Sequence, residues 1–353
     1  MQESSSGYGD YSHETFQALV NQPSGNHPFT HDTFPVFSGS ALTYKANCLK
    51  NYSSFIQQRE TRVKALTALG VVSFFWGTTW VASREGVKYM PALQLAAIRQ
   101  FLAGAIYVIF FIAKKFPWPK GKEWGHIFIL SFLNLFITNG LTTLGVKYIP
   151  AGLGALIAAI FPLWLVILGI FRPNSKMPLT AVIGLLFGFS GICIIFYEHL
   201  KEFFNPDFRF GIFISLTASI TWASGTLYTR RKAREFNPYF SIGLQMVISG
   251  IGLFIVSWLT GLKVPLDQVP WQSWASIGYL VIFGSLVSFV AYLYALQHLP
   301  IGQLSIYAYI NPIVAVILGA VLLGERLTPT IGVGGLVTLF GLWLVNETFR
   351  KRA

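Results

Sequence analysis

Arg99 is the one charged residue well inside an apolar run, as the eighth residue of the stretch 92–113. A helix rises about 1.5 Å per residue, so this position lies about 12 Å deep if the run crosses a bilayer. A charge at the bilayer centre costs about 2.5–3.5 kcal/mol, so the side chain needs a cavity or a polar partner. In a cavity its guanidinium could hold an anion or a carboxylate. In the structural alternative, it would donate to carbonyls freed near a helix break.

Uncharged polar side chains are concentrated in a few of the apolar runs. Asn134 and Thr138 are four residues apart and therefore share a helix face. Such groups either line a polar cavity or hydrogen-bond neighbouring helices together. For Asn139 and Asn311 we favour the cavity, because an amide has more hydrogen-bonding groups to satisfy than a hydroxyl. The predicted binding residues are Trp76, Thr79, Arg99, Asn134, Thr138, Asn139, Trp222, Gln245, Tyr292, Tyr309 and Asn311.

Apolar segments with the length of a membrane span would carry these side chains. The chain has 353 residues, of which 53% are hydrophobic and 11% charged, and its mean hydropathy is +0.55. A hydrocarbon core about 30 Å thick needs about 20 helical residues. The sequence therefore predicts an all-α polytopic membrane protein with ten transmembrane helices, at 66–83, 92–113, 125–146, 151–171, 179–197, 211–229, 239–260, 273–296, 302–323 and 329–346.

Two stretches of the chain, 148–172 and 298–326, repeat one pattern 150 positions apart. The matched pairs are Pro150 with Pro300, Gly152 with Gly302, Pro162 with Pro312 and Gly169 with Gly319. At an offset of 146, Trp76 matches Trp222 and Arg99 matches Gln245. We therefore expect two repeats, 64–200 and 208–348, with five helices each. Because five is odd, the second copy enters the membrane with the opposite orientation, so the repeats would be inverted.

Pro162 and Pro312 stand within these repeated apolar segments. An interior proline removes one backbone hydrogen bond and costs a helix about 3 kcal/mol. A membrane tolerates it where a neighbouring helix or a wet cavity satisfies the freed carbonyl. Paired interrupted segments in corresponding halves indicate the binding region of a transporter, so both prolines are predicted helix-break or hinge positions.

The formal net charge is +12, but the basic residues lie between apolar runs, which is typical of topology control and not of a nucleic-acid surface. With the N-terminus inside, 18 Lys and Arg fall on the cytoplasmic side and 7 outside. Both termini are therefore predicted to be cytoplasmic, in the cell inner (plasma) membrane. Residues 1–60 are polar and expected to be disordered. A start codon wrongly placed upstream would also explain this tail, and N-terminal sequencing would test it.

Enzyme and cofactor chemistry is not expected. The two cysteines make neither a disulfide framework nor a metal site, and no phosphate-binding Gly loop ending in Lys-Ser/Thr is present. The acidic residues nearest to the predicted spans, Glu85, Glu198 and Glu325, lie at their ends. Proton-coupled transport usually requires a titratable group along the path. We therefore predict no catalytic residue, no metal, no cofactor and no nucleic-acid partner.

Three sequence features carry a resemblance to a known family: the Trp76-Gly77 pair, Arg99 within AAIRQFLAG, and NPIVAVILGAVLLGERLT at 311–328. Together with the two five-helix repeats, they resemble the EamA-like branch of the drug/metabolite transporter (DMT) superfamily. The resemblance implies ten helices, cytoplasmic termini, a central cavity, and export or exchange of small metabolites, amino acids among them. The first repeat departs from the pattern, since Ser175-Lys176 stand where the second has Glu325-Arg326.

The function predicted from these features is a secondary transporter that moves small metabolites by alternating access. The lack of an intramembrane carboxylate favours a facilitator or a substrate exchanger, and a proton-coupled antiporter is the alternative among carriers. Outside the carriers, the alternative function is that of a membrane channel or a non-transporting receptor. The expected partners are a small-molecule substrate and the lipid bilayer.

Overall fold

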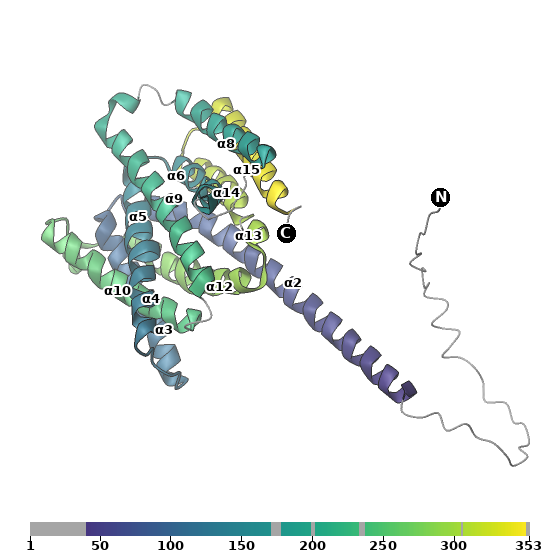
Figure 1. Cartoon of the computed structure of the whole chain (residues 1–353). Coiled ribbons are helices and arrows are strands. Elements are labelled where there is room, and N and C mark those ends of the chain that lie inside the picture. Colours follow the sequence, from purple (N-terminus) through teal and green to yellow (C-terminus); the bar gives the residue numbers. More distant parts are fainter. Residues whose placement is uncertain (1–39, 171–177, 199–201, 233–236, 305, 351–353) are drawn as a thin grey trace, which may run out of the picture. The chain divides into compact units, whose positions relative to one another are not determined.

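The computed structural model describes residues 40–170, 178–198, 202–232, 237–304 and 306–350 (Figure 1). The chain divides into two compact units, Met1–Phe55 and Ile56–Ala353, and the second contains the helices predicted to span the membrane. Within the described residues, seven helices are long and apolar enough to cross a bilayer, and three shorter apolar helices accompany them. Each of the ten predicted segments corresponds to one helix or to a chain of consecutive helices.

The first repeat consists of helices joined by short non-helical connections in its described part. Its helices are α2 (Ser40–Gly86), α3 (Ala92–Ala113), α4 (Lys122–Leu130), η1 (Ser131–Ile137), α5 (Thr138–Tyr148), α6 (Ala151–Ala158), α7 (Phe161–Ile170) and α8 (Leu179–Glu198). The structure differs from the expectation of disorder up to residue 60, since α2 begins at Ser40. The run 40–60 contains neither glycine nor proline, so nothing in it interrupts a helix. Residues 1–39 lie outside the described part of the chain.

The second repeat has the same order of elements, with two additional 3-10 turns, η2 and η3. Its helices are η2 (Glu202–Phe204), α9 (Pro206–Lys232), α10 (Pro238–Leu259), η3 (Leu266–Gln268), α11 (Trp271–Tyr279), η4 (Leu280–Val287), α12 (Ser288–His298), α13 (Ile301–Leu304), α14 (Tyr307–Leu323) and α15 (Pro329–Arg350). Both η1 and η4 are π-helical, and both lie in the middle of the third helix of their repeat. A π turn inside an α-helix often marks a functional region.

The π turns have the same side-chain support in both copies. The hydroxyl of Thr138 donates to the Leu133 carbonyl over 2.8 Å, and that of Ser288 donates to the Phe283 carbonyl over 2.5 Å. In each copy the donor follows its acceptor by five residues. Thr138 and Ser288 are 150 residues apart, as are Leu133 and Phe283, so the two hydrogen bonds occupy matching positions of the repeats. Because a π turn leaves some carbonyls without a regular backbone donor, hydroxyls of this kind satisfy part of the deficit.

Counterpart helices from the two repeats cross one another at glycines. A side chain on Gly104 would meet the backbone nitrogen of Val247 at 2.6 Å, and one on Gly250 would meet the nitrogen of Phe101 at 2.7 Å. At the offset of 146, Gly104 matches Gly250 and Phe101 matches Val247. The two contacts are therefore equivalent, since exchanging the two repeats turns one contact into the other. Such self-complementary contacts are those of a two-fold axis. The pairing also shows that α3 and α10 cross in antiparallel directions.

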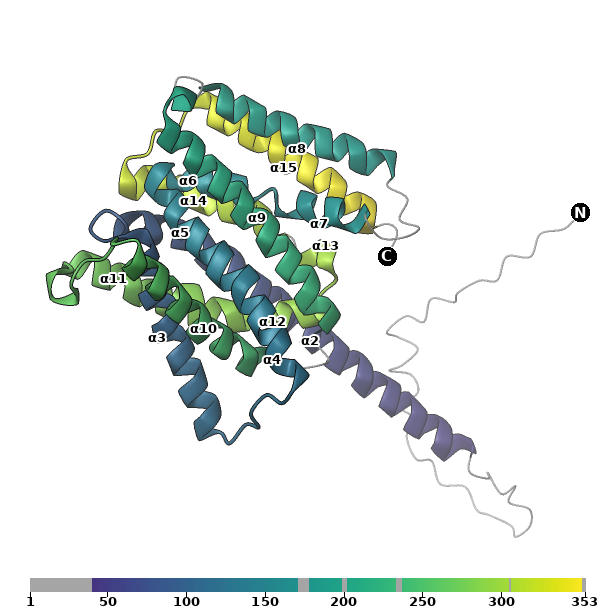
Figure 2. The same cartoon turned by 60° about the vertical axis from the view of Figure 1, so that its left-hand side comes forward.

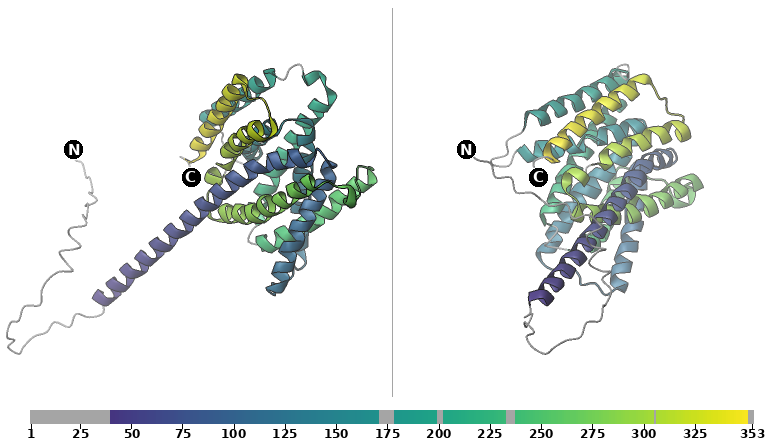
Figure 3. Two further views of the ribbon diagram at one scale, coloured as in Figure 1. Left: turned by 180° about the vertical axis from the view of Figure 1, so that it is seen from behind. Right: turned by 90° about the vertical axis from the view of Figure 1, so that its right-hand side faces the viewer.

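The same arrangement recurs where α8 packs along α15 (Figures 1 and 2). Gly191 lies against Gly334 and Thr338, while Gly341 lies against Gly184 and Gly188. Figure 3 shows this helix pair side by side from two further directions. Gly184 and Gly334, and likewise Gly191 and Gly341, are 150 residues apart in the sequence, so these repeated glycines let counterpart helices approach closely.

The fourth helix of each repeat is interrupted, but not at its proline. In the first repeat the break falls between Ala158 and Phe161, and Pro162 is the second residue of α7. In the second repeat, α13 ends at Leu304, and Pro312 lies inside the continuous helix α14. The expectation of a break at Pro312 is therefore corrected. Pro162 is tolerated because the first amides of a helix have no intrahelical acceptor. Pro312 is the sixth residue of α14, so it leaves the Ala308 carbonyl without its helical donor.

Candidate functional site

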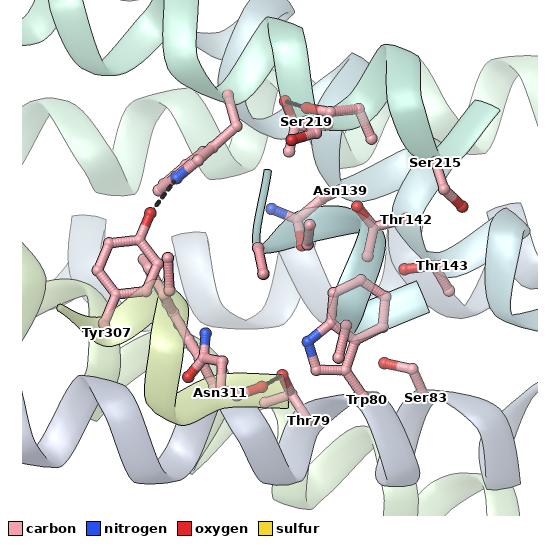
Figure 4. A pocket seen from close by; sticks show the side chains of 18 of the residues that line it. Thr79, Trp80, Ser83, Asn139, Thr142, Thr143, Ser215, Ser219, Tyr307 and Asn311 are labelled. Atoms are coloured by element: carbon pink, nitrogen blue, oxygen red, sulfur yellow. Dashed lines mark hydrogen bonds between the residues drawn. The ribbon is translucent and has the colours of Figure 1, made fainter. Parts of the chain in front are cut away.

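A central cavity lies between the two repeats and collects side chains from α2, α3, α5, α6, α9, α12 and α14. It offers about 130 Å³ to the centres of water-sized molecules, enough for several waters or a small polar molecule. Figure 4 shows the labelled side chains of α9 at one edge of this space and those of α2 at the opposite edge. Its lining includes Trp76, Thr79, Arg99, Thr138, Asn139, Trp222 and Asn311, which are seven of the predicted binding residues.

Arg99 is the only charged residue among those that line the cavity in the described part of the chain. Its side chain is 5% exposed, and its Nε–H donates to the Ser285 hydroxyl over 3.1 Å. Gly284 makes room for it, since a side chain there would come 3.0 Å from the Arg99 Nη2. Ser285 belongs to η4, not to a proline break, so Arg99 is held at a π turn and faces the cavity.

The π turn of η4 receives further donors from the first repeat. The Trp76 indole N–H donates to the Gly284 carbonyl over 3.2 Å, and the Tyr107 hydroxyl donates to the Leu286 carbonyl over 2.7 Å. With Arg99, three side chains from α2 and α3 thus contact this segment. The Gly284 and Leu286 carbonyls of the π turn thus accept hydrogen bonds from side chains of the other repeat.

Aromatic rings form one wall of the cavity. The rings of Trp76 and Trp222, which are repeat partners, meet edge to face with their centroids 5.4 Å apart. Trp76 also contacts Phe289 and Tyr307, each at a centroid distance of 5.4 Å. The Trp222 indole N–H donates to the Tyr307 hydroxyl over 2.7 Å, the bond drawn as a dashed line in Figure 4. This bond joins α9 to α14 across the wall.

Some polar groups of the lining are satisfied by neighbouring helices. The Thr138 hydroxyl lies 2.9 Å from that of Thr221, so it bridges α5 to α9 as well as supporting its own helix. Asn139 donates only a long bond, 3.4 Å, to the Asn134 carbonyl. The Asn139 amide therefore keeps most of its hydrogen-bonding capacity, whereas Thr138 uses its own to join two helices.

Other polar groups of the lining are buried and unsatisfied. The Asn311 Oδ1 and the Ser219 hydroxyl have no hydrogen-bond partner in the part of the chain that the structure describes. An unpaired buried polar group costs about 1–3 kcal/mol. These two are therefore the groups that a ligand or an ordered water would satisfy.

Four predicted binding residues lie outside the cavity lining. Asn134 is buried against Gly225, and Gln245 donates to the Ser241 hydroxyl over 2.7 Å where α10 packs on α3. Tyr292 lies behind the aromatic wall, with its hydroxyl 2.9 Å from that of Thr226. The fourth, Tyr309, packs against another hydrophobic cluster, and its hydroxyl has no partner among the described residues.

Other lining residues were not among the predicted binding residues: Trp80, Ser83, Thr142, Thr143, Ser215, Ser219, Phe289 and Tyr307. Helical spacing could have found some of them. Trp80 and Ser83 follow Trp76 by four and seven residues, and therefore share its face of α2. Ser215 and Ser219 precede Trp222 by seven and three residues and share its face of α9 in the same way.

Glu325 ties the two repeats together outside the central cavity. Its carboxylate oxygens accept hydrogen bonds from the backbone N–H groups of Ala151, over 2.7 Å, and Gly152, over 3.1 Å. These are the first two residues of α6, where a negative charge is favoured. Gly324 has a φ of +68° and ends α14, while the Glu325 N–H donates to the Gly319 carbonyl. Glu325 thus contacts backbone, and its repeat partner, Ser175, lies outside the described residues.

Known proteins resemble this chain over both repeats. The model of the EamA-like transporter family matches residues 63–197 and 209–347. The uncharacterized inner membrane transporter YedA of Escherichia coli (strain K12) is 30% identical over 263 residues, which cover 74% of this chain and 83% of YedA. The uncharacterized transporter YvbV of Bacillus subtilis (strain 168) is 25% identical over 299 residues, covering 82% and 93%.

A solved structure, described only as "Crystal structure of protein", shares the fold. It superposes with a TM-score of 0.60 at 17% sequence identity, covering 83% of this chain and 99% of that one. At this identity, the likeness supports the helical architecture alone.

Proposed function

The chain belongs to the EamA-like transporter family, and on that premise we propose that it is a secondary carrier that moves a small metabolite by alternating access. It is a polytopic membrane transporter and not an enzyme. The observation that carries the proposal is the central cavity, lined from both repeats, with aromatic rings, amides and one cation. A site between repeats suits a carrier, because movement of one repeat against the other exposes it to each side in turn.

The residues proposed to bind substrate are those that both the sequence and the cavity select. Arg99, Asn139 and Asn311 offer polar groups that internal hydrogen bonds leave partly or wholly unused. Trp76 and Trp222 offer apolar surface, and Thr79 and Thr138 complete the set from α2 and α5. These groups suit a small polar or amphipathic compound, with amino acids and related metabolites as the first candidates.

We propose that the two repeats have inverted orientations in the inner (plasma) membrane of a cell. Both termini then lie on the cytoplasmic side. Two observations support it. Counterpart helices α3 and α10 cross in antiparallel directions at Gly104 and Gly250, as inverted repeats require. The excess of Lys and Arg on one side favours a cytoplasmic location for that side. The name of the relative YedA, an inner membrane transporter, is consistent with this membrane.

The movement we propose centres on the interrupted fourth helices. Ala159, which lies between α6 and α7, and Tyr307, the first residue of α14, both belong to the lining of the cavity. Pro312 lacks the N–H that would bind the Ala308 carbonyl, so α14 has one backbone bond fewer to break, while Pro162 stands at the start of α7 beside the interruption. In this mechanism, substrate binding at the wall is coupled to rotation of these half-helices.

Site variants test the binding assignment. Trp76→Ala removes the ring at the centre of the aromatic wall, and Asn311→Ala removes the unsatisfied amide. Both should reduce transport in proteoliposomes while the protein remains in the membrane at a normal level. Trp271→Ala is the matched control, because Trp271 is 73% exposed and lies outside the cavity lining. Normal transport by both cavity variants would refute the site.

A further inference from the structure

The geometry points to a substrate class, and this inference rests on the carrier function proposed above. We propose that the substrate is a small organic molecule with a single carboxylate, bound by the Arg99 guanidinium, and without net positive charge. The carboxylate is the chemistry that complements a buried, unpaired guanidinium at the wall of an otherwise uncharged cavity.

Charge balance is the first argument. Arg99 has an exposed fraction of 5% and lines a cavity without any acidic side chain among the described residues. No described carboxylate forms an ion pair with it, whereas Lys64 and Lys88 pair with Glu60 and Glu85. A buried cation without a counter-charge strongly favours binding of an anion. A cationic substrate would meet repulsion that nothing in this lining offsets.

The direction of the guanidinium is the second argument. Its Nε–H is occupied by the Ser285 hydroxyl, and Nη2 packs against Gly284, where a side chain would come within 3.0 Å of it. Nη1 and Nη2 have no hydrogen-bond partner in the part of the chain that the structure describes, so their N–H groups are available. A carboxylate can accept two parallel hydrogen bonds from such a pair, which fixes both its position and its orientation.

The difference between the two repeats is the third argument. Gln245 stands at the repeat position of Arg99, but it is neutral, donates to Ser241 and lies outside the cavity. The site therefore has one cationic anchor, Arg99, which suits a monocarboxylate better than a dicarboxylate or a phosphate dianion. The rest of the cavity offers the apolar rings of Trp76 and Trp80 and the unpaired acceptor of Asn311. These groups suit a substrate that also has an apolar part and one hydrogen-bond donor.

Matched pairs of ligands test the inference without a variant. The unfolding temperature of the purified full chain in detergent is measured against lactate, 3-phenyllactate, benzoate and threonine, and against the primary amide of each. The amides keep the shape and lose the carboxylate. We expect at least one carboxylate to raise the unfolding temperature with half-saturation at least about tenfold below that of its amide. If no carboxylate binds better than its amide, the inference is overturned.

Variants then assign the effect to the side chain. Arg99→Gln introduces the residue found at the repeat position and should abolish the preference for carboxylate over amide, while Arg99→Lys should keep part of it. Arg209→Gln is the control, since Arg209 is exposed on α9 and does not line the cavity. A preference that persists in Arg99→Gln would overturn the inference. If Arg99→Gln fails to fold, the inference is still tested by the carboxylate and amide pairs on the unaltered protein and by the carboxylate preference of Arg99→Lys.

Transport measurements separate this inference from the carrier function. Counterflow of the same labelled pairs is measured in proteoliposomes. If a carboxylate binds in an Arg99-dependent way but shows no trans-stimulated flux, the proposed ligand class is supported and the proposed carrier function is refuted. If a neutral amide shows trans-stimulated flux and this flux does not depend on Arg99, the carrier function is supported and the proposed substrate class is overturned.

Discussion

Glu325→Ala should loosen the contact between the two repeats at the start of α6. The change removes both carboxylate oxygens that accept from the Ala151 and Gly152 N–H groups. A hydrogen bond to a charged group contributes about 1.5–3 kcal/mol. Because Glu325 is only partly buried, we take the lower value for each bond, which gives about 3 kcal/mol for the pair. A loss of about 3 kcal/mol changes the equilibrium constant between the closed and the open contact by about 150-fold.

Hydrogen exchange at the affected amides is the direct assay. The N–H groups of Ala151 and Gly152 should exchange about two orders of magnitude faster in Glu325→Ala, because they are the first amides of a helix and have no other acceptor. Glu325→Gln keeps one carbonyl oxygen and should give an intermediate rate. Arg326→Ala is the matched control, since Arg326 is exposed and adjacent. Unchanged exchange in Glu325→Ala, or an equal effect in Arg326→Ala, would refute the reasoning.

Two further substitutions probe the packing around the cavity. Gly225→Ala would place a methyl group far inside van der Waals contact with the Asn134 Oδ1, so it should destabilise the fold by about 1–3 kcal/mol and lower the unfolding temperature. Gly278→Ala, where nothing lies within 4 Å of the added methyl, should have little effect, and equal losses would contradict the packing argument. Trp222→Phe removes the hydrogen bond to the Tyr307 hydroxyl, costing about 1 kcal/mol and lowering transport. Full transport by this variant would show that the bond between α9 and α14 is dispensable.

The sequence is sufficient to predict the helices because their signal is local. An apolar run long enough to span a bilayer has few alternatives to a helix, and the ten predicted segments match the observed helices. The repeated glycines are also visible in the sequence, although their reason is not. Gly104 and Gly250 are needed because each lies against the backbone of the counterpart helix, a contact that only the three-dimensional arrangement shows.

The predicted binding residues and the cavity lining differ in part because of helix phase. The sequence predicts Tyr309 in the cavity, whereas Tyr307, the first residue of α14, lines it. Two residues along a helix correspond to a turn of about 200°, so the two side chains point to different faces. The π turn of η4 likewise changes the phase of its helix, which brings Ser285 to Arg99. Gln245 matches Arg99 by position but satisfies its own amide locally. A repeat predicts where a residue lies and does not predict what that residue contacts.

Counterflow in proteoliposomes tests the central claim, that the chain is a carrier, most directly. Vesicles containing the purified protein are loaded with unlabelled compound and exposed to the same labelled compound, over a panel of amino acids and other small metabolites, with and without an imposed pH gradient. We expect uptake that is stimulated by compound on the opposite side and is indifferent to the pH gradient. Flux without trans-stimulation would contradict the carrier, and flux that follows the gradient would contradict the proposed facilitator or exchanger.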